Sequence, residues 1–290
     1  MALRSTEIGA LLRERKGAFE EDRVGGCDVC FVMFQEPAPD DPCAGAGERC
    51  VNWAVKMFQP SPPLAHCELL MPPVPSEEGE RTQFATYLGR KSAWQTNEED
   101  NYRFYLVDNA DRWRAVPVFS ANAAACVRQE CDTEIGVQYS MLRYLSATRP
   151  LRVLAGLLPD ARGAPAHCAT LTSRILRNAA GVMAHPSAWY GPTSLYEELS
   201  ETAARRAEAL GAVAQEAPPT AVAHAVEQLL RAPMTRDTVA GVGDEGCMGA
   251  VRHLTLRCVG ALANGDAVAA RLAQKQLATV LLRWVVLRDK

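Results

Sequence analysis

The sequence predicts an α+β fold in which short strands come first and long helices follow. Up to about residue 130, apolar runs of strand length alternate with loops rich in proline and glycine. Beyond Pro192, apolar residues recur at three- and four-residue spacing almost to the end of the chain. Strands and helices that are segregated along a chain indicate an α+β fold, because a parallel α/β fold would alternate them.

The predicted strands form a meander of short segments. We expect them at 27–34, 50–58, 65–71, 83–88, 102–107 and 113–119. Pro117 places the last of these at an edge of the sheet, because proline has no N–H to donate to a central ladder. A charged amphipathic helix is expected before the strands, over 5–22, and Gly25 with Gly26 ends it.

The predicted helices occupy the second half of the chain. We expect them at 138–147, 151–158, 168–180, 194–213, 220–231, 246–263 and 266–288, with a loop over 237–246. One apolar stripe marks the last helix, formed by Leu277, Val280, Leu281, Trp284 and Leu287. This stripe has to be covered, so we expect residues 200–290 to pack on the rest of the chain, with a protein partner as the alternative cover.

Composition and charge exclude several classes of protein. Of the 290 residues, 48% are hydrophobic and 22% charged, which is typical of a packed globular chain. The net charge of −3, without any basic stripe, argues against partners such as nucleic acid or an anionic membrane. No apolar run is long enough to span a bilayer, and the N-terminal segment lacks the features of a signal peptide. We therefore expect a cytoplasmic protein.

Cys168 is the candidate nucleophile. It follows a loop rich in proline and glycine and begins an apolar helical stripe that includes Leu171 and Ile175. The positive end of the helix dipole lowers the pKa of a thiol at that position, and the free N–H groups there can receive an oxyanion. A thiolate at a helix start, facing an imidazole on a strand, is suited to amide or ester cleavage. The alternative is that Cys168 is a small buried apolar residue, as most free cysteines are.

His66 is the candidate base among the five histidines. It lies on a predicted strand, on the same face as Glu68 two residues later. Glu68 is the nearest candidate for the group that orients the imidazole, with a side chain from 102–107 as an alternative. His167 adjoins Cys168 and is expected to point away, and the other histidines lie in a loop or among the C-terminal helices. A core histidine and a solvated glutamate are the structural alternatives for His66 and Glu68.

The ten cysteines also allow a zinc site. Four thiolates could close a tetrahedron, from Cys27, Cys30, Cys43 and Cys50. The first two fall on one predicted strand, where residues three apart face opposite ways, and the second two are widely spaced. We therefore expect neither a metal nor another cofactor.

The order of five motifs resembles the circularly permuted NlpC/P60 family of papain-like thiol hydrolases. That family includes lecithin:retinol acyltransferase-like proteins and relatives in large DNA viruses. The motifs, which span about residues 24–199, are Gly26-Cys27-Asp28-Val29, His66-Cys67-Glu68-Leu69, Gly136-Val137-Gln138-Tyr139-Ser140, His167-Cys168-Ala169-Thr170-Leu171 and Trp189-Tyr190-Gly191-Pro192-Thr193-Ser194-Leu195-Tyr196. The chain departs from the family pattern at the inserted Cys27 and at Ala169, where the family has serine.

The resemblance implies an N-terminal helix over 1–23, a permuted papain-like NlpC/P60 domain over 24–199 and a helical extension over 200–290. It implies a thiol hydrolase or acyltransferase that cleaves an amide or ester through a Cys168 acyl-thioester, with His66 as base and Glu68 beside it. The substrate would be a peptide, an amide or a lipid ester. The alternative is an inactive papain-like structural or interaction protein, for instance a virion component, located in the host cytoplasm or in the virion.

Overall fold

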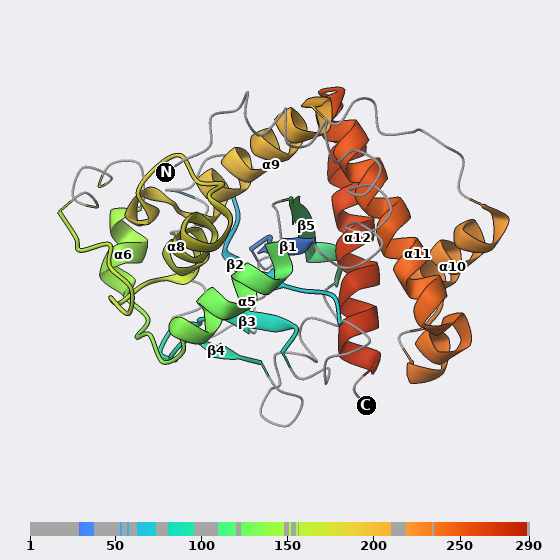
Figure 1. Cartoon of the computed structure of the whole chain (residues 1–290), viewed down its shortest axis with the longest axis horizontal. Helices are drawn as coiled ribbons and strands as arrows, with labels where there is room; N and C mark the ends of the chain where they lie inside the picture. The colour runs from blue at the N-terminus through green and yellow to red at the C-terminus, as the bar shows by residue number, and fades with distance from the viewer. Residues whose placement is uncertain are drawn as a thin grey trace.

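A computed structural model gives the fold, which is shown in Figure 1. It describes residues 29–37, 53, 57, 63–73, 81–95, 110–119, 123–147, 151, 155, 157–209, 219–233 and 235–288. The predicted helix over 5–22 and the predicted strand over 102–107 lie outside these residues. The predicted strand over 50–58 is wrong at the two positions described, because Trp53 and Met57 are helical and more than half exposed.

One antiparallel sheet of five strands forms the centre of the described structure, and the α+β class is confirmed. Its strands are β1 (Cys30–Gln35), β2 (His66–Leu70), β3 (Gln83–Ala85), β4 (Ala93–Trp94) and β5 (Trp113–Val118). Their order is β4-β3-β2-β1-β5, so β1 to β4 form a meander and β5 returns to pair with β1. The edge position predicted from Pro117 is confirmed, since β5 is the outer neighbour of β1.

Helices occupy the rest of the described chain. They are α5 (Ala123–Thr133), α6 (Met141–Ser146), α8 (Cys168–Ala180), α9 (Pro192–Ala209), α10 (Thr220–Arg231), α11 (Arg236–Ala263) and α12 (Ala267–Arg288), with short 3₁₀ turns η2 (Ala110–Arg112) and η4 (Ser187–Trp189). The predicted helix at 168–180 has the predicted bounds. The expected loop over 237–246 is wrong, because these residues belong to α11 and only Gly243, at φ 72°, departs from helical geometry.

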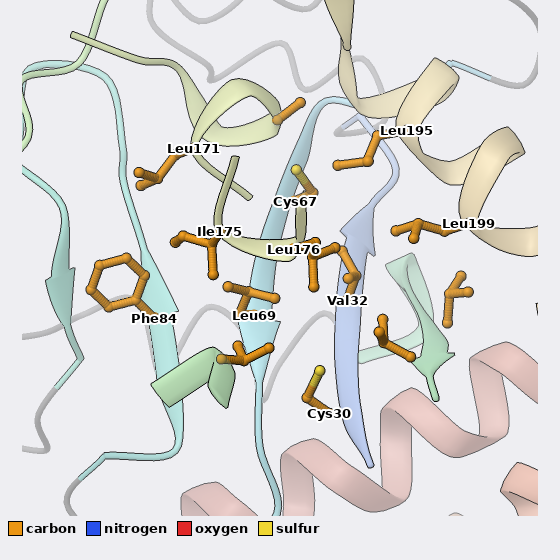
Figure 2. Packing of buried hydrophobic residues seen from close by; sticks show 14 of the residues in the cluster. Cys30, Val32, Cys67, Leu69, Phe84, Leu171, Ile175, Leu176, Leu195 and Leu199 are labelled. Atoms are coloured by element: carbon orange, nitrogen blue, oxygen red, sulfur yellow. The ribbon is translucent and has the colours of Figure 1, made fainter. Parts of the chain in front are cut away.

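The sheet lies between two groups of helices, and the side chains of β1 alternate between two apolar cores. Cys30, Val32 and Phe34 belong to the core that the sheet shares with α5, α8 and α9 (Figure 2). Phe31 and Met33 belong to the core that it shares with α10, α11 and α12. β1 is therefore buried on both faces, which explains the apolar run Cys30–Phe34.

The last helix packs against the sheet through its apolar stripe. All five side chains of the stripe are buried, and they share a core with Phe31, Met33 and Trp113 of the sheet. Two polar contacts also hold α12: Lys275 Nζ lies 3.3 Å from Oε1 of Glu36, which follows β1, and Tyr196 OH of α9 donates to Gln274 Oε1 at 2.7 Å. Among the described residues, no helix combines the length and apolar character that crossing a membrane requires.

Candidate active site

Cys168 is the first residue of α8, a helix of 13 residues. The residue before it, His167, is the N-cap, and its Nδ1 accepts a hydrogen bond from the Ala169 N–H at 3.1 Å. Ala166 is held in turn by backbone hydrogen bonds to Gln138 and from Ser140, each of 3.0 Å. These bonds fix the position at which the helix begins, and they leave Cys168 with only 2% of its surface exposed.

His66 is the first residue of β2 and is also buried. Its ring stacks on Tyr87, with 4.6 Å between the centroids and 20° between the planes. Trp113 contacts the same ring edge-on at 6.1 Å. Two aromatic side chains therefore restrict the orientation of the imidazole.

Glu68 faces His66 along the same strand, and Glu68 Oε2 lies 3.6 Å from His66 Nε2. That distance is too long for a hydrogen bond, but it places a carboxylate beside the ring in a buried setting. The carboxylate is fully buried and accepts hydrogen bonds from Gln83 Nε2 at 2.8 Å and from Tyr87 OH at 2.9 Å. The structure thus places Cys168, His66 and Glu68 in one site, with Glu68 held by two donors.

The charges of this site shift the pKa values of the thiol and the imidazole in opposite directions. The pKa of Cys168 lies well below its usual value, because the neighbouring Cys67 thiol and the positive charge of His66 outweigh the effect of burial. Burial alone would lower the pKa of His66, but its interactions with Cys168 and then with Glu68 raise it to about 9. Both shifts favour a thiolate at Cys168 beside an imidazolium at His66.

Cys67 is a member of the site that the sequence analysis did not identify. By strand alternation it faces away from Glu68, and Figure 2 shows it between β2 and α8. Its S–H donates to Oγ1 of Thr172, one turn beyond Cys168, at 3.9 Å, and its thiol lies near enough to lower the pKa of Cys168. Burial, followed by these interactions with Cys168, raises the pKa of Cys67 well above its usual value. The period-two pattern of β2 was the signal that could have located it.

Three further side chains lie at the thiol. His167 was expected to point away, but its Nδ1 accepts from the Ala169 N–H, which holds the ring over the first turn of α8, and the imidazole helps to lower the pKa of Cys168. The Tyr144 ring contacts His167 edge-on at 5.6 Å, and its buried OH has no hydrogen-bond partner among the described residues. Burial, followed by the charge of Cys168, raises the pKa of Tyr139 and of Tyr144.

A buried ion pair supports the loop that leads to the nucleophile. Arg174, on α8, donates to both carboxylate oxygens of Glu134, at 2.9 and 2.7 Å, and neither side chain is exposed. The same guanidinium donates to the carbonyl of Ala164 at 3.1 Å, and Glu134 Oε2 accepts from the Gly163 N–H at 3.3 Å. The pair therefore fastens residues 163–164 to the helix that carries Cys168.

The residues considered for zinc are described only at Cys30. That side chain is fully buried in β1, and burial raises its pKa to about 12, whereas zinc binds thiolates. Among the described residues, no group of three or more histidine, cysteine or acidic side chains could hold a metal ion.

Comparison of the chain with family models, with curated proteins and with solved structures finds no match.

Proposed function

We propose that this protein is a papain-like thiol hydrolase or acyltransferase that acts on an amide or an ester. The observation that supports this most is the pairing of Cys168 with His66, because their pKa values are shifted toward a thiolate and an imidazolium. We also propose that the sheet and α8 correspond to the permuted NlpC/P60 arrangement, in which the histidine strand precedes the nucleophile helix. The C-terminal helices are then an extension of that fold.

In the first half of the proposed reaction, the Cys168 thiolate attacks the carbonyl carbon of the substrate. A carbon–sulfur bond forms, and the bond to the amine or alcohol breaks as His66 gives its proton to the leaving group. His66 Nε2 faces Glu68, so Nδ1 is the nitrogen that exchanges the proton. In the second half, water or an acceptor alcohol attacks the thioester, His66 takes its proton, and the thiolate leaves.

The developing oxyanion needs a hydrogen-bond donor near Cys168. The Ala169 N–H is already engaged by the His167 cap, which removes one backbone donor of the helix start. The buried Tyr144 OH has no partner among the described residues and lies beside His167. We therefore assign Tyr144 as the side-chain donor to the oxyanion.

A second candidate function is a binding protein that retains this fold without turnover. The observation that favours it is the 2% exposure of Cys168, because a nucleophile must meet its substrate. Under this alternative the ion pair of Cys168 and His66 would stabilise the fold, and the chain would not form an acyl-thioester.

The two functions are separated by acylation with an activated ester, p-nitrophenyl acetate. A hydrolase should release a burst of nitrophenol and carry one acetyl group on peptide 163–174, in which Cys168 is the single cysteine. The Cys168→Ala variant should lose both signals, and the control Cys126→Ser should keep them. His66→Asn should slow acylation roughly 100-fold or more. Acetylation that is absent, or unchanged by Cys168→Ala, would contradict the proposal.

A further inference from the structure

The two cysteines of the site come from different elements and lie close enough for each thiol to shift the pKa of the other. Cys67 is the second residue of β2, and Cys168 is the first residue of α8. Cys67 Sγ also lies 3.9 Å from Thr172 Oγ1, which is four residues after Cys168 and therefore on the same face of the helix. This contact places Cys67 against the face of α8 that carries Cys168, one turn further along the helix, independently of its interaction with Cys168.

We propose that Cys67 is the resolving cysteine of Cys168, and that a hydroperoxide converts the two into a reversible disulfide. The disulfide would occupy the nucleophile and switch the site off until a thiol reductant opens it. The inference needs a thiolate at Cys168 but no hydrolysis, so it goes beyond the proposed function and can be tested apart from it.

The chemistry runs in two steps. In the first, the Cys168 thiolate attacks one oxygen of hydrogen peroxide, the O–O bond breaks, and hydroxide leaves as water after taking the proton of the His66 imidazolium. In the second, Cys67 sulfur attacks the sulfur of the Cys168 sulfenic acid. The S–S bond forms, the S–O bond breaks, and hydroxide leaves as water with the proton of Cys67. Two thiols and one peroxide give one disulfide and two waters.

The environment of this pair distinguishes it from another pair of buried cysteines. Cys30 and Cys131 belong to the same apolar core and lie close enough for their charges to interact. Burial raises the pKa of both thiols. Neither thiol lies at the start of a helix or has an imidazole that lowers its pKa, so both remain protonated at neutral pH. This second pair should stay reduced, and it serves as an internal control.

The test treats the reduced full chain with a small excess of hydrogen peroxide at neutral pH, blocks free thiols with N-ethylmaleimide and digests without reductant. Trypsin places Cys67 alone in peptide 57–81 and Cys168 alone in peptide 163–174, so their cross-link is unambiguous. We expect this linked pair as the main product, its loss after dithiothreitol, and Cys131 recovered as its maleimide adduct, and therefore reduced, in peptide 129–143.

The Cys67→Ser variant completes the test. Without a resolving thiol, Cys168 should proceed to the sulfinic acid, which dithiothreitol does not reverse. The control Cys131→Ser should still form the disulfide. The proposal is overturned if wild-type Cys168 stays reduced, if it reaches the sulfinic acid without the cross-link, or if it links to another cysteine. The cross-link and the sulfinic acid are measured without any ester substrate. A chain that forms the disulfide but does not hydrolyse p-nitrophenyl acetate would therefore contradict the proposed function and leave the disulfide proposal intact.

Discussion

The charge of His66 is maintained in a setting that should remove it. Burial favours the neutral imidazole, yet the thiolate of Cys168 and the carboxylate of Glu68 together hold the pKa of His66 at about 9. Glu68 can act in this way because Gln83 and Tyr87 satisfy its oxygens and fix its position. The protonation of His66 therefore depends in part on a carboxylate that acts through the imidazole.

Replacing Glu68 by glutamine should narrow the pH range of acylation on its alkaline side. The imidazolium of His66 persists up to about pH 9 in the wild type, whereas without the carboxylate its pKa falls toward the ordinary value. At about pH 9 the second-order rate of acylation should fall roughly fivefold for a loss of one pKa unit, since the protonated fraction then falls from about one half to about one tenth. The measurement is the pH profile of acylation by p-nitrophenyl acetate. Glu130→Gln, which alters a buried carboxylate bound to Arg162 and Asn178, should leave the profile unchanged.

How much of the site could be predicted from sequence depends on the kind of contact. Cys168 and His66 could be selected because a helix start and a strand histidine are visible as local patterns, and Glu68 lies two residues from His66 on the same face. Cys67 and Tyr144 could not be selected, because their approach to the thiol depends on how β2, α6 and α8 pack. The orientation of His167 was mispredicted because its role as N-cap overrides the expectation drawn from its position next to Cys168.

At the scale of elements, α8 is defined by its two ends. It begins with the His167 cap and ends at Gly181, whose φ of 59° is in the left-handed region that favours glycine. The predicted bounds of this helix match the structure because both ends are marked by local sequence signals. In contrast, α5 was missed since its buried face is built mainly from alanine and cysteine, and 237–246 was mistaken for a loop because its glycines outweighed its helical spacing.

Two glycine substitutions should change stability in opposite directions. Gly181→Ala should cost about 1 kcal/mol, because alanine is strained at a left-handed C-cap even though the space around it is open. Gly260→Ala, within α11 and equally open, should stabilise by roughly 0.5–1 kcal/mol, since alanine loses less backbone entropy in a helix. Urea unfolding of the two variants beside the wild type measures both values. Equal effects would show that the ends of α8 do not depend on its cap.

Removing the arginine from the buried ion pair of Arg174 and Glu134 should lower the free energy of unfolding far more than removing the arginine from an exposed pair. Arg174→Met leaves a buried carboxylate without its partner and should cost about 3–5 kcal/mol. Arg205→Met removes the exposed partner of Glu201, at 3.7 Å, and should change stability by less than about 1 kcal/mol. The midpoints of urea unfolding of the Arg174→Met and Arg205→Met variants, compared with that of the wild type, measure this difference. A small effect at Arg174 would mean that the loop before Cys168 is held by other contacts.

At the scale of the whole molecule, α12 and the sheet form one core. Trp284 is 1% exposed within that core, and its Nε1 donates to Asp244 Oδ1 at 3.2 Å, which also ties α12 to α11. The apolar stripe on this helix could be predicted from its spacing, but the surface it covers could not, because periodicity shows a buried face without identifying its neighbour. The structure shows that the neighbour is the sheet, together with α10 and α11.

Truncating the stripe should therefore destabilise the whole fold. Trp284→Ala should cost about 3–5 kcal/mol, through lost burial and the cavity that remains. Leu272→Ala, on the same helix but 53% exposed, should change stability by less than about 1 kcal/mol. If the sheet and the helices unfold as one unit, tryptophan fluorescence and far-ultraviolet circular dichroism should give the same midpoint for Trp284→Ala. Two separate transitions would show that the C-terminal helices are an independent unit.

The central claim is that Cys168 is a thiolate at neutral pH because His66 and Cys67 stabilise it. The most direct measurement is the rate at which iodoacetamide alkylates Cys168, followed from about pH 4 to pH 10 by mass spectrometry of peptide 163–174. Cys126, alone in peptide 115–128, is the internal reference. The account predicts a rate for Cys168 whose midpoint lies well below the ordinary thiol value of about 8.5, and which moves toward that value in His66→Asn. A midpoint at or above that of Cys126, unchanged by His66→Asn, would contradict it.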